Sequence, residues 1–469
     1  MARAGANQQA LGHYIAEHRE SRVPHNILEA ARLCLADWMA VAIGAGEEPA
    51  GRLVRETVAG WRSAGRSSVL YGAPTAAPFA ALANGTLAHC LDFDDTHVPS
   101  VTHTSAPVWA ATLALGEEIG ASEGEMLRAF ILGFEVAARV GAGLGQGVTA
   151  RGWHSTGVFG RIGAAAASAA LLGLSAGEAV HALGAAATQA SGLTASFGTM
   201  AKPYHAGKAA MDGVLSAQLA ARGFQAGQDL LEPGGALNQA VIQDGTLKIT
   251  QANFEHWEIL ANSFKPYAAC HLVHPAADAA HALALAPELL ASVRASVSPL
   301  AMQITGGASG RPLTPLAAKF DLKYCIALAL HGRVLSAADF AEPWRLDPAI
   351  CATAEKVEAT AQAGIGFASA RLDVDTVDGQ QKSAVIAIAK GHPGNPMSWD
   401  DMWSKFNGLV ERRLVGRTES FFRQLKDFGS GQALIGIREE LTQLGRAAQG
   451  RQLRASAADS VSPAGRLPS

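Results

Sequence analysis

Histidines and carboxylates gather in one short stretch of the chain, between residues 89 and 105. The stretch begins HCLDFDDTH and ends THTS, and it carries Asp92, Asp94, Asp95, His89, His97 and His103. Carboxylate and imidazole groups at this density suit a divalent metal site. They also suit acid–base chemistry in which an aspartate orients or tunes a histidine. A third interpretation is structural: the aspartates cap a helix that begins near Ser105.

Two further segments combine ionisable side chains with small residues. In residues 151–157 (RGWHSTG), His154 lies between two glycines, just before an Ala/Gly-rich helical pattern whose N-terminus can receive an anion. Residues 200–208 (MAKPYHAGK) carry Lys202 with a second lysine, a tyrosine and a histidine. These groups can bind carboxylates or stabilise an enolate. The alternative for His154 is a structural histidine, and the alternative for residues 200–208 is a solvated loop.

Two more segments lie in the second half of the chain. Residues 264–275 (FKPYAACHLVHP) include Lys265, His271 and His274 near a proposed domain boundary, where ligand sites often form. The two histidines have the spacing of a helical metal pair, but no HExxH motif or thiolate supports that interpretation. Residues 319–325 (KFDLKYC) begin an apolar helical pattern. Tyr324 within them is either a buried core residue or a proton donor.

Composition narrows the class of protein. The chain has 469 residues, 49% of them hydrophobic, and a formal net charge of −3, which excludes a disordered protein and disfavours nucleic-acid binding. Its five cysteines are scattered without a CxxC pair, which favours a reducing compartment. No signal peptide or membrane span is apparent. We therefore expect a cytoplasmic protein with neither a membrane nor a nucleic acid as partner.

The elements that must position these segments divide into two domains. Residues 1–267 show helical spacing of apolar residues with many Ala and Gly, which is typical of closely packed helices. Residues 400–445 return to this pattern and are expected to complete the same domain. Residues 268–399 mix helices with short strands and predict a smaller α+β domain, and residues 446–469 predict a disordered tail. The fold class is therefore mainly α, a large all-helical bundle with a smaller α+β domain.

Local patterns predict individual elements within these domains. Helices are expected at residues 26–44, with Asn26 as the cap, and at 106–119, 125–140, 161–172, 176–189, 324–330 and 337–342. Strands are expected at residues 301–305, 370–374 and 384–389. Asp378-Gly379 predicts a hairpin turn between the last two strands.

Taken together, these segments resemble the MmgE/PrpD family. The likeness covers roughly residues 25–440 and rests on LDFDDTH with THTS, GWHSTGVFG, KPYHAGKAA, FKPYAACHLVHPAADA and FDLKYCIALAL, in that family's order. The resemblance implies an active site between a large all-helical domain and a smaller α+β domain, in a homodimer. The family includes 2-methylcitrate dehydratases, cis-aconitate decarboxylases and iminodisuccinate epimerases. Its members generally need no metal, so the resemblance implies neither a metal nor another cofactor.

The resemblance also implies the residues of the site. The expected catalytic residues are Asp92, His103, His154, His271 (preferred over His274) and Tyr324. The expected substrate-binding residues are Thr96, Lys202 and Lys265, and no metal ligand is expected.

All three family reactions form or quench a carbanion next to a carboxylate of a small di- or tricarboxylate. Lysines can stabilise its charge, and a neutral histidine can move the proton. Asp92 can orient a histidine or act as a base if burial raises its pKa, and Tyr324 can protonate a leaving hydroxyl.

The leading hypothesis is a cofactor-independent hydro-lyase of the 2-methylcitrate dehydratase type, which abstracts a proton next to a carboxylate. An epimerase of an amino- or imino-dicarboxylate such as iminodisuccinate is the first alternative. A decarboxylase of the cis-aconitate type is the second, because the spacing from Asp92 to His103 is one residue longer than in those decarboxylases.

Overall fold

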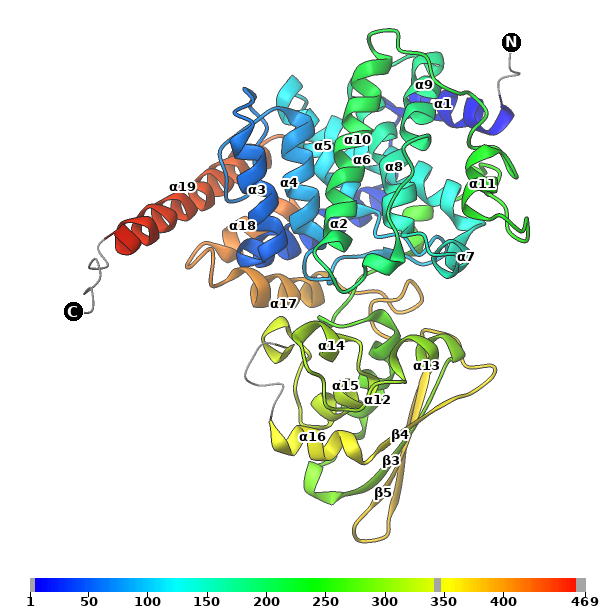
Figure 1. The fold of residues 1–469 in the computed structure, drawn as a ribbon, viewed down its shortest axis with the longest axis vertical. Coiled ribbons are helices and arrows are strands. Elements are labelled where there is room, and N and C mark those ends of the chain that lie inside the picture. Colours follow the sequence, from blue (N-terminus) through cyan, green and yellow to red (C-terminus); the bar gives the residue numbers. More distant parts are fainter. Residues whose placement is uncertain (1–4, 341–346, 461–469) are drawn as a thin grey trace, which may run out of the picture.

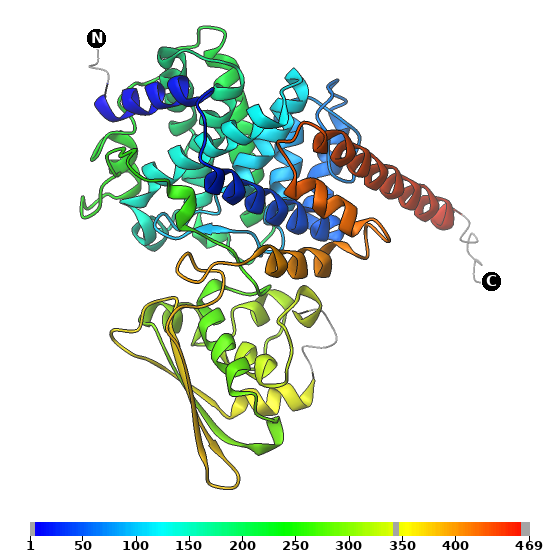
Figure 2. The same ribbon diagram turned by 180° about the vertical axis from the view of Figure 1, so that it is seen from behind.

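The chain folds into a large helical body and a smaller body built around a sheet (Figure 1). The structure is a computed structural model that describes residues 5–340 and 347–460. The same division is seen from behind, where the sheet again lies in the smaller body (Figure 2). This arrangement confirms the predicted fold class, mainly α with a smaller α+β part.

Close helix crossings form the centre of the helical body. Its central helices are α4 (Ala77–His89), α6 (Glu123–Ala142), α8 (Ser155–Leu171) and α10 (Ala201–Ala220). α10 packs against α4 and α8, and α6 packs against α8. A Cβ atom at Gly133 would lie 2.6 Å from the Gly163 carbonyl oxygen, so only glycine fits at this crossing. The Ala- and Gly-rich composition therefore reflects helices that pack almost backbone to backbone.

Further helices surround this centre. They are α1 (Ala6–His18), α2 (His25–Gly44), α3 (Pro49–Gly60), α5 (Ser105–Ile119), α7 (Gly145–Ala150), α9 (Ala176–Ala187) and α11 (Ala236–Val241). Those that correspond to the helices predicted at residues 26–44, 106–119 and 176–189 agree with them to within a few residues at most ends, and the other four are not among the individual predictions. The helix predicted from residue 161 begins six residues earlier, at Ser155 of α8. α2 begins directly after Pro24, so Asn26 lies inside the helix and does not cap it.

The smaller body holds a mixed sheet with the strand order β4–β3–β5–β6. Its strands are β3 (Leu290–Val297), β4 (Val357–Ala361), β5 (Ala370–Thr376) and β6 (Gln381–Ile386). β4 runs parallel to β3, and β5 runs antiparallel to both β3 and β6. Helices α12 (His274–Leu283), α13 (Pro299–Thr305), α15 (Leu322–Leu330) and α16 (Pro348–Glu355) contact these strands. Side chains of β5 alternate between buried and more exposed, as expected for a sheet covered on one face.

The local predictions for the smaller body are partly right. β5 and the hairpin turn are confirmed, with Gly379 at a φ of +81°. The strand predicted at residues 301–305 is wrong, because this segment belongs to helix α13. The Ser298 side chain accepts a hydrogen bond from the Ala301 N–H at 3.1 Å and so caps that helix. Strands β3 and β4 are missing from the prediction.

Two other segments of the smaller body differ in their bounds. β6 begins at Gln381, before the predicted start at residue 384, and ends at Ile386. The helix predicted at residues 337–342 is a short 3-10 turn, Ala337–Phe340, and the last two residues lie outside the described ones.

After the sheet the chain returns to the helical body. α17 (Trp399–Val410) and α18 (Thr418–Lys426) pack against α2, and α19 (Ala433–Ser460) extends away from the body (Figure 1). The domain boundaries that the sequence predicts at residues 267 and 399 stay predictions. Within residues 5–340 and 347–460, no helix combines the length and apolar character that a bilayer crossing requires.

α19 continues past residue 446, where the sequence predicts a disordered tail. Residues 446–460 contain no proline and several residues of high helix propensity, such as Ala, Arg, Gln and Leu, so the helix can continue. The remainder of the predicted tail, residues 461–469, lies outside the described residues.

Candidate active site

The loop that follows α4 is held in a strained conformation. Asp92 has a φ of +52°, in the left-handed region that a non-glycine residue rarely adopts. Two lysines from beyond the helical core donate hydrogen bonds to the carbonyl oxygens of this turn. Lys265 Nζ lies 2.6 Å from the Asp92 oxygen, and Lys319 Nζ lies 3.0 Å from the Leu91 oxygen. Strain at a single residue persists when its surroundings impose it, as these two contacts do.

The Asp92 carboxylate is surrounded by positive charge. Its Oδ1 lies 2.6 Å from Lys202 Nζ, 3.3 Å from Lys265 Nζ and 4.0 Å from His103 Nε2. Burial raises the pKa of Asp92, but the two ammonium groups outweigh it and hold the pKa well below its usual range. Asp92 is therefore ionised and suited to anchoring cations, and the condition under which it was expected to act as a base is not met.

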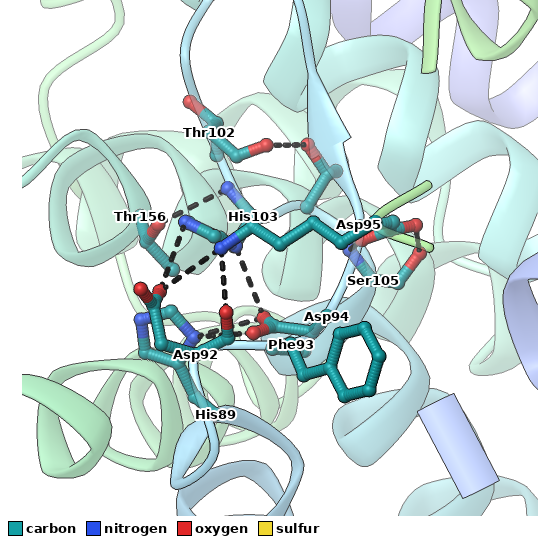
Figure 3. A network of polar contacts seen from close by, with 12 residues as sticks. His89, Asp92, Phe93, Asp94, Asp95, Thr102, His103, Ser105 and Thr156 are labelled. Atoms are coloured by element: carbon teal, nitrogen blue, oxygen red, sulfur yellow. Dashed lines mark hydrogen bonds and ion pairs between the residues drawn. The ribbon is translucent and has the colours of Figure 1, made fainter. Parts of the chain in front are cut away.

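Asp94 joins two histidines into a buried triad. Its carboxylate lies 2.8 Å from His89 Nδ1 and 3.2 Å from His103 Nδ1, and the two rings are 4.6 Å apart (Figure 3). Burial raises the pKa of Asp94, but the two imidazoles outweigh it and hold the pKa well below its usual range. Burial lowers the pKa of His89 to about 4, although Asp94 opposes that shift.

His154 lies at the start of α8 and packs on the same triad. Its ring stacks on His89 at 5.5 Å, and its Nδ1 lies 3.1 Å from Nδ1 of His205 on α10. The ring edge meets Phe197 at 4.9 Å. Burial, assisted by His89 and Lys202, holds the pKa of His154 well below its usual range. This histidine is therefore neutral at physiological pH, as a general base must be.

Thr96 and His271 reach the site through a short strand pair at the junction of the two bodies. β1 (Thr96–His97) pairs with β2 (Asn262–Ser263), which places Thr96 opposite Ser263. The Ser263 hydroxyl lies 3.1 Å from His271 Nε2. Burial, with smaller contributions from His274 and Lys265, holds the pKa of His271 well below its usual range.

Two histidines of the conspicuous motifs take structural positions. His274 Nε2 lies 3.1 Å from the Ala269 carbonyl oxygen, and burial lowers its pKa to about 3. His97 is held between Ser100 and Glu258. The preference for His271 over His274 stays a prediction.

Tyr324 is the one expected catalytic residue whose side chain makes no hydrogen bond, ion pair or ring contact within the described part of the chain. It lies in the core of the smaller body on α15, fully buried, and its hydroxyl has no hydrogen-bond partner among the described residues. Burial raises its pKa, assisted by Cys351 and Cys325. Its N–H donates to Asp321, which caps α15. The core-residue interpretation therefore fits this geometry better than that of a proton donor.

Asp95 supports the third interpretation of the acidic motif. Its carboxylate accepts hydrogen bonds from the N–H and the hydroxyl of Ser105, the first residue of α5, and from Asn262 Nδ2 at 2.6 Å (Figure 3). Burial and the neighbouring Asp37 raise its pKa to about 7. The three aspartates of one motif thus do three things: Asp92 anchors lysines, Asp94 joins histidines and Asp95 holds a helix start.

The structure adds residues to the site that the sequence does not assign. His89 and Asp94 stand within the motif, and His205 and Lys319 stand within quoted segments, so proximity in sequence could have found them. Lys405 of α17 has no such signal. Its Nζ donates to Asp37 Oδ1 at 2.5 Å and to the Phe93 carbonyl oxygen at 2.6 Å, beneath the strained loop.

Two features bear on what the site can bind. His89, Asp94 and His103 each offer a ligand atom within 4.8 Å of the others, a spacing that can hold a metal ion. Their mutual pairing accounts for the same positions without one. Beside this triad lies a cavity of about 310 Å³ whose wall includes Glu48, His89, Asp92, Phe197, Lys202 and Lys319. Its lining comes from both bodies, and its cations suit a carboxylate ligand.

A site of histidines, lysines and paired carboxylates between a helical and an α+β body is typical of an enzyme. The MmgE/PrpD N-terminal domain matches residues 9–250, and the MmgE/PrpD C-terminal domain matches residues 267–427. The chain belongs to the MmgE/PrpD family.

Curated relatives of the chain carry one activity in their names. Cis-aconitate decarboxylase-like protein oryM of Aspergillus oryzae is 28% identical over 91% of this chain and 96% of its own length. A cis-aconitate decarboxylase of Aspergillus terreus is 27% identical over 92% of this chain and 94% of its own. Human cis-aconitate decarboxylase is 35% identical over 35% of this chain and 36% of its own. These likenesses support the family and an enzyme, not one substrate.

Proposed function

We propose that the protein is a lyase that transfers a proton at a carbon next to a carboxylate of a small di- or tricarboxylate. Decarboxylation of a cis-aconitate-type substrate is the reaction we put first. The observation that carries the proposal is the position of His154, which packs against the Asp94 triad beside the lysines on Asp92. The names of the relatives favour decarboxylation, although the spacing from Asp92 to His103 counts against it and dehydration leads the hypotheses from the sequence.

The cations of the site suit a developing negative charge. Lys202 and Lys265 converge on Asp92 and can also receive a substrate carboxylate. When the carbon–carbon bond breaks, CO₂ leaves and the electron pair delocalises onto the neighbouring unsaturated carboxylate. His154 then delivers a proton to carbon. His103 is held by Asp94 through Nδ1, and its Nε2 lies on the side of Asp92 and the lysines.

Dehydration of a 2-methylcitrate-type substrate is the second candidate. It begins with removal of a proton, for which a neutral histidine such as His154 is suited. It also needs an acid for the departing hydroxyl. The buried position of Tyr324 removes the acid first expected for that role, so another group such as His103 would have to serve.

One experiment separates the candidates. The protein is incubated in deuterated water with cis-aconitate, 2-methylcitrate and iminodisuccinate in turn, and each mixture is followed by proton NMR. We expect loss of CO₂ from cis-aconitate with one deuterium on carbon. Elimination of water from 2-methylcitrate alone would select dehydration. Deuterium entering iminodisuccinate without elimination would overturn the lyase proposal in favour of an epimerase.

The proposed reaction uses no metal, although the spacing of the Asp94 triad would allow one. We expect the activity to survive exhaustive chelation, because the lysines already supply the positive charge. Loss of activity that a divalent ion restores would contradict this and would assign the metal to His89, Asp94 and His103. A matched sample dialysed without chelator is the control.

A further inference from the structure

The contact between His154 and His205 is unlike the other contacts of the site. His205 lies on α10, half-buried, while His154 is almost fully buried at the start of α8. The two Nδ1 atoms are 3.1 Å apart, which is hydrogen-bond distance. Among the described residues, neither ring makes another hydrogen bond. The pair therefore links a buried site residue to one that reaches solvent.

Gly192 lies against both histidines and leaves room for their rings. Its φ is +111°, and a Cβ atom there would lie 3.2 Å from the His205 ring and 3.4 Å from the His154 Cβ. Its carbonyl oxygen also accepts the His154 backbone N–H at 2.9 Å. Any larger residue would strain the backbone and push the rings apart. The close approach of the two histidines is thus built into the backbone at this point.

Two facing Nδ1 atoms can share only one proton. If both rings are neutral, one Nδ1 donates and the other accepts, so the two rings hold opposite tautomers. The donor ring has its lone pair on Nε2, and the acceptor ring has its proton on Nε2. Transfer of the shared proton exchanges these states, so that a proton arriving at one Nε2 releases a proton from the other.

We propose, as an extension of the function proposed above, that His205 is the proton relay of His154 and connects the reacting carbon to bulk water. In protonation of carbon, the His154 Nε2 proton goes to carbon while its Nδ1 receives the Nδ1 proton of His205. In the same step His205 takes a proton from water at Nε2, so neither ring becomes an imidazolate. The two tautomers are then exchanged, and they revert when a proton from water reaches His154 Nε2 in the emptied site and His205 Nε2 releases one. Abstraction runs the same steps in reverse. No electron transfer or co-reactant is needed.

The charges around the pair explain why a relay is needed. His154 faces His89, His103 and Lys202, so a positive charge on its buried ring is unfavourable. Without an Nδ1 partner, proton delivery by the neutral ring would leave an imidazolate, and abstraction would leave a buried imidazolium. Partial burial, assisted by Arg161 and Lys202, lowers the pKa of His205 and disfavours a second proton on its ring, and the half-buried ring is accessible to water. The proton is therefore transferred through the His205 ring, and the doubly protonated ring does not accumulate.

The first test uses His205→Ala with added imidazole. We expect kcat to fall by about tenfold or more with KM changed less than about twofold, because the substrate contacts remain. Free imidazole should restore much of the lost kcat in His205→Ala, while His205→Phe, which leaves no room for it, should not respond. Loss without rescue, or a rise in KM at unchanged kcat, would overturn the relay.

A matched control variant is available on α9. His181 is also half-buried, and its Nδ1 lies 3.1 Å from the Ala226 carbonyl oxygen. It lies outside the site, so His181→Ala should retain kcat and show no response to imidazole. A similar loss in this variant would attribute the His205 effect to general destabilisation and overturn the proposal.

A second readout does not depend on activity. In protein labelled with ¹⁵N-histidine, long-range proton–nitrogen NMR should show His154 and His205 as opposite tautomers at neutral pH. The His154 signals should lose their fixed tautomer in His205→Ala. Identical tautomers, or a His154 spectrum unaffected by the variant, would overturn the relay. If opposite tautomers are found but no candidate substrate reacts, the proposed function fails while the proton-sharing pair stands.

Discussion

The two halves of the site hold their charged groups differently. In the helical half, three buried carboxylates are paired with groups of the same body: Asp94 with His89 and His103, Asp95 with Ser105, and Asp37 with Lys405 of α17. Asp92 is shared between Lys202 of this body and Lys265 of the junction. The junction and the α+β half contribute Lys265 and Lys319. These lysines reach across to backbone oxygens of the helical half.

We infer from this difference that the two halves have different roles, one in proton transfer and the other in ligand binding. A network whose members are paired within one rigid body can hold a histidine in one orientation, as proton transfer requires. Lysines that cross between bodies instead fix the strained loop and offer positive charge to a ligand bound between them. We therefore expect chemistry to depend on the helical half, and binding to depend on both.

Replacement of His154 in the helical half should have the largest effect. His154→Gln removes the ring that moves the proton, and we expect kcat to fall by roughly 10²–10⁴-fold in steady-state assays. His97→Gln is the control, because His97 lies in the acidic motif but is bonded to Ser100 and Glu258. If both variants lost kcat equally, the helical half would owe its importance to structure rather than to chemistry.

Lys405→Met tests the pairing beneath the loop. The side chains of Lys405 and Asp37 are 1% and 0% exposed, so the variant leaves the Asp37 carboxylate buried without its cation. We expect a loss of about 3–5 kcal/mol in the free energy of unfolding, measured with urea.

Two other variants calibrate this result. Lys390→Met breaks the ion pair with Asp401, whose partners are 36% and 35% exposed, and should cost about 1 kcal/mol or less. Asp37→Asn combined with Lys405→Met should cost less than Lys405→Met alone, because no charge is left unpaired. Equal losses for the two lysine variants would contradict the distinction between buried and exposed ion pairs.

Acidification should destabilise the protein above the range in which carboxylates titrate. The folded pKa is about 4 for His89 and about 3 for His274, and it is also lowered for His154 and His271. A histidine in the unfolded chain has a pKa near 6.5. Between that pH and the lower pKa of the folded state, the unfolded chain therefore binds protons that the folded chain does not bind. Stability therefore falls as the pH drops from about 6.5 toward 4.

Asp95 opposes this trend, because its folded pKa of about 7 makes the folded chain bind a proton that the unfolded chain releases. The histidines are more numerous, so the unfolding temperature should still be lower at pH 5 than at pH 7.5. A constant or rising unfolding temperature on acidification would mean that the buried rings carry protons in the folded state.

The helical half is the part that the sequence predicts well. Its apolar residues recur with helical spacing, and its small residues mark close crossings such as Gly133 on Gly163. Its ionisable residues also lie close together in sequence, from His89 to His103. Local patterns suffice here because most of the interactions that they encode are local or run between regular helices.

The smaller body is predicted less well because its structure depends on distant partners. β3 and β4 form a parallel pair between segments that are some sixty residues apart, which no local pattern reveals. The apolar residues of 301–305 favour a strand, but Ser298 caps a helix that includes them. Lys405 is likewise placed by the packing of α17 on α2 and not by any motif.

Tyr324→Phe should have the smallest effect, and it tests the α+β half directly. The Tyr324 hydroxyl is buried without a partner, so its removal should leave stability unchanged or raise it by about 1 kcal/mol. We expect kcat to change less than about twofold, since the Tyr324 hydroxyl makes no hydrogen bond to another expected site residue within the described part of the chain. In the control Tyr267→Phe, the lost hydroxyl donates to Asp278 at 2.6 Å, so stability should fall by about 1.5–3 kcal/mol. A tenfold or larger fall of kcat in Tyr324→Phe would mean that this hydroxyl reaches the substrate during turnover, so that chemistry would depend on both halves of the site.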